Sequence, residues 1–103
     1  MSFNVLFMAH APDADWHQHQ SLIHTGQFKL VSIMVRDQVE ALEAAKEAQE
    51  AHQIEFILLC PGFTHEDVAE LRQAFDGQIG VAVARGDGPS SLISAEARRR
   101  AYQ

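Results

Sequence analysis

Four short apolar runs, separated by segments long enough for helices, constrain the fold of this chain more than any other feature. The runs are Phe3–Ala9, Phe28–Val35, Ile54–Leu59 and Ile79–Ala84. Each is rich in Val, Ile, Leu or Phe and lacks strict polar alternation, which is typical of strands covered on both faces. The segments between them have crossover length rather than hairpin length, so we expect the strands to be parallel.

Capping signals predict helices in the segments after the second, third and fourth runs. Asp37-Gln38-Val39-Glu40 is typical of a capping box that opens a helix reaching about Gln53. Thr64-His65-Glu66-Asp67 is a second such signature, and Asp76-Gly77 would end that helix. Pro89-Ser90 opens the last predicted helix.

The segment from Asp13 to Thr25 has the weakest local signal in the chain. Asp13 could cap a helix that buries Trp16 and Ile23, and Gly26 could end it. The apolar periodicity is poor, however, and the residues from His17 to Gln20 are all polar. A partly looped segment therefore stays open as the alternative.

This order of elements predicts an α/β protein. We expect one small domain over residues 1–103, built as a three-layer sandwich around an open, mainly parallel four-stranded sheet. The arrangement would be Rossmann-like or flavodoxin-like, and we favour the strand order 2-1-3-4. That order places the switch point of the sheet between the first and third strands.

Charge and cysteine usage exclude several classes of function. A net charge of −6 disfavours nucleic acid or an anionic membrane as the main partner. A single cysteine leaves no disulfide framework and no paired-cysteine zinc site. The first apolar run lacks the basic flank and the length of a signal peptide, and no run reaches the length of a membrane span. We expect a cytoplasmic protein with no cofactor.

Two loops carry the strongest functional signal, because each follows an apolar run and precedes a predicted helix. They are Cys60-Pro61-Gly62-Phe63-Thr64-His65 and Arg85-Gly86-Asp87-Gly88-Pro89-Ser90. In an open α/β sheet such loops lie side by side at the carboxyl ends of the strands, where ligands bind. The sequence therefore predicts a binding site formed by both loops.

The second loop has the chemistry of an anion site. Gly86 and Gly88 would let a ligand approach the main chain, and Arg85 offers a planar donor fork for carboxylate or phosphate. Ser90 would begin a helix whose free N–H groups attract anions, and Asp87 could accept from a ligand hydroxyl. The alternative is a tight strand-to-helix turn with a capping serine and a solvated arginine.

The first loop supplies candidate catalytic groups. Cys60 lies near a helix N-terminus, although a buried cysteine that ends a strand is usually a small hydrophobe. Gly62 shapes the turn, Thr64 opens the helix, and His65 in its first turn could donate to an anion or carry a proton.

The histidines do not form a recognisable metal motif. His10, His17, His19 and His24 cluster in the first quarter of the chain, but no Cys or HExxH partner completes a site. We predict no metal site. His10 ends the first strand, which makes it a candidate pocket residue beside the switch point.

From Cys60 to Ser90 the chain resembles a family of short bacterial proteins of uncharacterised function. The likeness rests on the strand that ends in Cys60, on Pro61-Gly62-Phe63-Thr64-His65-Glu66 and on Val83-Ala84-Arg85-Gly86-Asp87-Gly88-Pro89-Ser90. It implies a small α/β fold with a shared site. It implies no activity, substrate or catalytic residue.

These observations leave three functional hypotheses. The first is a protein that binds a small anionic or polar ligand at the strand ends. The residues expected to line that site are His10, Cys60, Gly62, Thr64, His65, Arg85, Gly86, Asp87, Gly88 and Ser90. The second is a small enzyme of proton-transfer or hydrolytic type, with His10, His65, Cys60 or Asp87 as candidate catalytic groups.

The third hypothesis is a structural or regulatory homo-oligomer without a ligand. Self-association is expected in any case, because a four-stranded sheet leaves two edges and small helices cannot hide all of its apolar area. Closed symmetry makes a homodimer the default, and a larger homo-oligomeric ring is the alternative. The basic cluster Arg98-Arg99-Arg100 is not expected to bind a partner. We expect it in the last turns of the final helix, where its cations complement the helix macrodipole.

Overall fold

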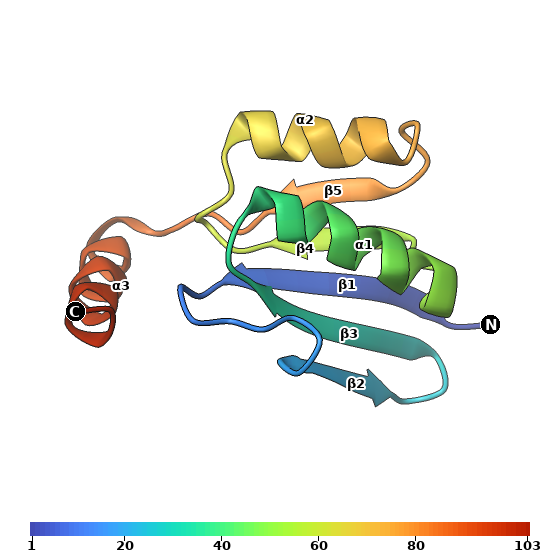
Figure 1. Cartoon of the computed structure of the whole chain (residues 1–103), viewed down its shortest axis with the longest axis horizontal. Coiled ribbons are helices and arrows are strands. Elements are labelled where there is room, and N and C mark those ends of the chain that lie inside the picture. Colours follow the sequence, from blue (N-terminus) through green and yellow to red (C-terminus); the bar gives the residue numbers. More distant parts are fainter.

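A computed structural model describes residues 1–103 as a mixed five-stranded sheet with three helices (Figure 1). The elements in chain order are β1 (Phe3–His10), β2 (Gln20–His24), β3 (Phe28–Val35), α1 (Gln38–His52), β4 (Phe56–Leu59), α2 (His65–Ala74), β5 (Gly80–Val83) and α3 (Gly88–Ala101). The protein is thus α/β, as its pattern of apolar runs predicted.

The sheet has the strand order β2-β3-β1-β4-β5. β1 pairs in parallel with β3 on one side and with β4 on the other, and β4 pairs in parallel with β5. These four parallel strands are the four apolar runs, and their neighbours are those of the order 2-1-3-4. The prediction of a four-stranded sheet is wrong, because β2 adds a fifth strand antiparallel to β3.

Of the two alternatives for residues 13–25, the helix does not form: the segment is a loop followed by a strand, β2. Backbone N–H groups of Gln18 and His19 both donate to the Asp15 carbonyl, which closes one turn and no more. The chain then forms β2 and returns to β3 through a three-residue connection, residues 25–27, in which Gly26 has a φ of +110°. A positive φ of this kind suits a tight hairpin, and pairing with β3 outweighs the weak local helix signal.

The predicted capping signals form at α1 and α2, but not in the same way. At α2 the Thr64 hydroxyl accepts from Asp67 N–H and the Asp67 carboxylate accepts from Thr64 N–H, a complete capping box. At α1 Asp37 accepts from Glu40 N–H, while the Glu40 carboxylate accepts from the backbone and guanidinium of Arg36. The hydrogen bond from the Arg36 side chain lowers the pKa of Glu40 below its ordinary value.

One face of the sheet carries the core. Leu6 and Met8 of β1 are fully buried there beneath α1, and α2 packs beside it against β5. Four alanines of α1 are also buried, and their small side chains allow the helix to lie close to the strands. The Gln38 side chain on α1 donates to the Asp67 carbonyl and to Glu70 on α2, which ties the two helices together on this face.

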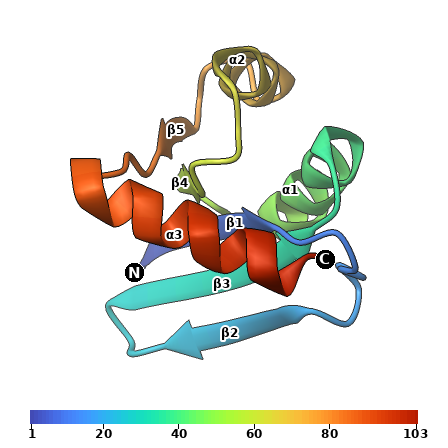
Figure 2. The same cartoon turned by 90° about the vertical axis from the view of Figure 1, so that its left-hand side faces the viewer.

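The predicted three-layer sandwich is wrong, because no helix covers the other face of the sheet. The backbone of α3 does not pack against that of any other helix or strand, and the helix has no buried residue. It leaves the carboxyl end of β5 and crosses in front of the strand ends (Figure 2).

None of the three helices is both long enough and apolar enough to cross a membrane.

Candidate functional site

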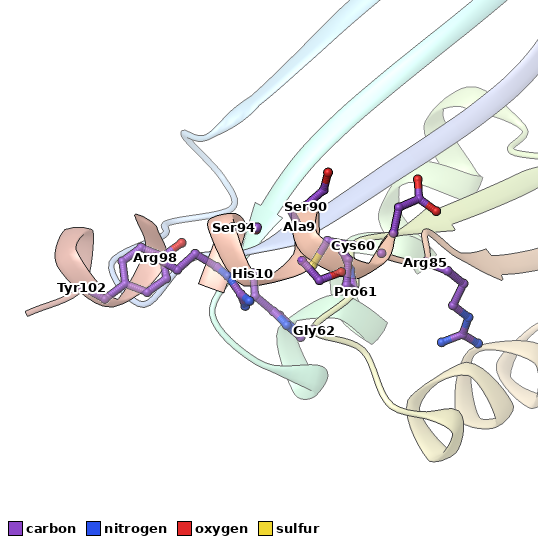
Figure 3. A pocket seen from close by; sticks show the side chains of 13 residues that line it. Ala9, His10, Cys60, Pro61, Gly62, Arg85, Ser90, Ser94, Arg98 and Tyr102 are labelled. Carbon is purple, nitrogen blue, oxygen red and sulfur yellow. The ribbon is translucent and has the colours of Figure 1, made fainter. Parts of the chain in front are cut away.

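The carboxyl ends of β1, β4 and β5 and one side of α3 enclose a cavity of about 570 Å³ (Figure 3). Thirteen residues line it: Ala9, His10, Cys60, Pro61, Gly62, Arg85, Gly86, Asp87, Ser90, Ser91, Ser94, Arg98 and Tyr102. Most of these side chains are polar, and they come from three separate parts of the chain.

Strand pairing brings these distant parts together. β1 lies between β3 and β4, and the Cys60 N–H donates to the Met8 carbonyl at 3.0 Å, just beyond the end of β4. The Ala84 N–H donates to the Leu59 carbonyl at 2.8 Å in the same way. The residues that follow the three strands therefore emerge at one edge of the sheet, as expected for parallel neighbours.

His10 is held firmly in the wall of the cavity. Its ring stacks on buried Phe63, with ring centroids 4.0 Å apart and planes inclined by 21°. A Cβ atom at Gly62 would lie 2.9 Å from His10 Nδ1, so only glycine leaves room for the ring. His10 Nε2 is buried and has no hydrogen-bond partner. An unpaired buried polar atom costs about 1–3 kcal/mol, which makes this nitrogen a candidate for a bound partner.

α3 provides the outer wall through a polar stripe. Ser90, Ser94, Arg98 and Tyr102 are spaced by four residues, which places them on one side of a helix, and Ser91 lies beside them. Sequence reasoning missed four of these residues: Ser91, Ser94, Arg98 and Tyr102. The four-residue spacing of polar side chains directly after the Arg85–Ser90 loop was the signal that could have found them.

The start of α3 differs from the prediction. The helix begins at Gly88 rather than at Pro89-Ser90, and Asp87 rather than a serine stands at the N-cap. The Asp87 side chain makes no capping hydrogen bond, so its carboxylate is free to accept from a ligand. A Cβ atom at Gly86 would collide with the Ser91 hydroxyl in its present position, so glycine allows the loop to approach the first turn of α3 closely.

Seven of the ten residues expected in the binding site line the cavity. These are His10, Cys60, Gly62, Arg85, Gly86, Asp87 and Ser90. Thr64, His65 and Gly88 do not line it. The Thr64 hydroxyl is used in capping α2, and His65 begins that helix as an exposed residue where the chain leads away from the strand ends.

Two arginines supply the positive charge of the cavity. Neither Arg85 nor Arg98 forms an ion pair, whereas the neighbouring Arg99 is paired with Glu96. Arg98 extends from α3 toward His10, while the Arg85 side chain extends in the other direction (Figure 3). The expectation that Arg85 and the start of α3 converge on one point is therefore not met by this side-chain position. Of the two arginines, Arg98 is the one that extends toward His10 (Figure 3).

The histidines of the first quarter do not assemble into a metal centre. No group of three or more His, Cys, Asp or Glu side chains is placed to hold a metal ion. His19 Nδ1 instead accepts from the Asp15 N–H at 2.9 Å, which stabilises the turn before β2. Among the histidines, only His10 lines the cavity.

Comparison with known proteins assigns the chain to a family. The model of a family of unknown function, DUF6506, matches residues 3–97. The chain belongs to the DUF6506 family. No curated protein and no solved structure matches it.

The DUF6506 match is wider than the likeness seen between Cys60 and Ser90. It runs from the start of β1 into the last turns of α3, and so includes His10, both loops and Ser94. Arg98 and Tyr102 lie just beyond the matched range. Membership thus covers the fold and most of the cavity wall.

Proposed function

We propose that this DUF6506 protein binds a small anionic or polar molecule in the cavity at the carboxyl ends of β1, β4 and β5. One observation carries the proposal: Arg98 and Arg85, neither with an acidic partner, border the same cavity as His10 and the serine stripe of α3. Side chains of these types, gathered from three parts of the chain, suit recognition of an anion.

The size and lining of the cavity favour a small polar ligand. Its volume of about 570 Å³ falls within the range of roughly 300–1,000 Å³ typical of small-molecule sites. The first turn of α3, with Ser90 and Ser91, borders the cavity, and the free N–H groups of a helix start attract negative charge. Arg98 would pair with a carboxylate or phosphate, and Asp87 would accept from hydroxyl groups.

A thermal-shift screen against carboxylates, sugar phosphates and nucleotides tests this function. The screen is then repeated on Arg98→Ala and on Arg100→Ala, which removes an arginine from the same helix outside the cavity. A charge-assisted hydrogen bond contributes about 1.5–3 kcal/mol, so Arg98→Ala should weaken binding roughly ten- to a hundredfold. Arg100→Ala should bind as the wild type does.

Two outcomes would contradict the proposed function. If no compound of these classes shifts the melting temperature, the hypothesis of a homo-oligomer without a ligand is favoured instead. If a compound binds and both arginine variants bind it equally well, the anion is held elsewhere. Arg85→Ala tests the second arginine in the same way.

An enzyme of proton-transfer type is the second candidate function, supported by the setting of His10. Phe63 and Gly62 fix its ring, and Nε2 lacks a partner within the protein. A fixed imidazole beside a polar cavity suits a general acid or base. If a compound found in the screen is turned over, His10→Gln should abolish turnover while retaining binding.

A further inference from the structure

The sheet face that points away from α1 and α2 is apolar and uncovered. Alternation along the strands and the strand register place Phe3, Phe28, Met34, Phe56 and Ile23 on this face. The ring of Phe3 packs edge-on against Phe28, with centroids 5.4 Å apart, yet Phe28 is still 41% exposed. None of the strand residues on this face is charged. A solvated sheet face normally carries polar side chains.

α3 presents a second uncovered apolar surface. Its polar stripe borders the cavity, which leaves Leu92 and Ile93 off that stripe, and these are 74% and 72% exposed. The first turns of α3 project on the side of the sheet that faces away from α1 and α2 (Figure 2). Leu92 and Ile93 belong to these turns.

We propose that two copies of this chain form a twofold dimer through their open sheet faces, with Leu92 and Ile93 of each α3 contacting the other copy. The inference does not depend on the proposed function. It extends the general expectation of self-association to one surface, and it accounts for both uncovered apolar features.

The character of the surface favours a second copy as the occupant. A twofold interface brings each patch against itself, so a patch of one charge sign would repel its copy. The open face is uncharged and avoids that repulsion even though the chain carries a net charge of −6. The same uncharged face offers nothing to pair with a charged peptide or with anionic lipid headgroups.

The area of the surface also explains why α3 takes part. Five strands of four to eight residues present roughly 300–600 Å² at ordinary strand spacing and rise. A standard interface buries about 800 Å² on each partner. The sheet face alone falls short of that area, and the outer side of α3 would supply the remainder.

Sedimentation of the full chain tests the proposal. At tens of micromolar the wild type should sediment at twice the chain mass of 11.5 kDa. Phe28→Glu would place two carboxylates in the interface and should raise the dimer dissociation constant at least about a hundredfold. Val39→Glu is the matched control, because Val39 is 66% exposed on α1, away from this face. It should stay dimeric.

Two results of the sedimentation experiment would overturn the proposed dimer. A monomeric wild type would overturn it, as would Phe28→Glu and Val39→Glu dimers of equal affinity. If Phe28→Glu loses its circular dichroism signal, Met34→Glu on the same face replaces it, with the same expected loss of dimer. Leu92→Glu tests α3 separately: an unchanged dissociation constant would remove α3 from the interface.

Discussion

At the scale of single residues, the candidate site depends on the fit between Gly62 and His10. Gly62 leaves the space that the imidazole occupies, and Phe63 supplies the surface on which it stacks. The sequence placed His10 and Gly62 in one site from their positions at strand ends. It could not predict their contact, because the contact depends on the register between β1 and β4.

Gly62→Ala should destabilise the protein by about 1–3 kcal/mol, because its Cβ would push against His10 Nδ1. Chemical denaturation measures the loss. In a His10→Ala background the same substitution should cost far less, since the opposing ring is gone. Equal costs in both backgrounds would show that the two residues do not interact.

At the scale of elements, the hydrogen bonds at the helix N-termini distinguish residues that cap a helix from residues that are free to bind a ligand. Thr64 was expected in the binding site, but its hydroxyl serves the capping box of α2 with Asp67. Asp87 stands at the corresponding position of α3 without such a bond, and it borders the cavity. A capping signature and a ligand-binding helix start look alike in sequence, and only the observed hydrogen bonds distinguish them.

Thr64→Ala should therefore lower stability by about 1 kcal/mol, the ordinary cost of losing an N-cap, and leave ligand affinity unchanged. The first quantity comes from denaturation, and the second from the thermal-shift screen corrected for the new melting temperature. Thr64→Ser, which keeps the hydroxyl, serves as the control. A variant that loses affinity for a compound the wild type binds would return Thr64 to the binding site.

At the scale of the whole molecule, α3 stands apart from the rest of the structure. A helix of 14 residues that buries no side chain is only marginally stable in water. We expect its order to depend on the proposed dimer, on a bound ligand, or on both. This links the two proposals through one element.

Hydrogen exchange measures that dependence. In the wild-type dimer the backbone amides of α3 should be protected, while in Phe28→Glu they should exchange close to the rate of an unfolded chain. Amides of β1 and α1 should be protected in both, since their core packing does not involve α3. Equal protection of α3 in both proteins would mean that dimer formation does not order this helix.

The sequence by itself determined the α/β class, the neighbours of the four parallel strands and the meeting of the Cys60 and Arg85 loops. These follow from local apolar patterning and from the geometry of crossover connections. Only the tertiary structure decided that residues 20–24 form a strand, that α3 leaves one face open and that Arg98 and Tyr102 reach the cavity. The physical reason is the same in each case. The pairing of β2 with β3, the position of α3 and the direction of its polar stripe are all set by how distant parts of the chain are arranged. Local propensity does not encode that arrangement.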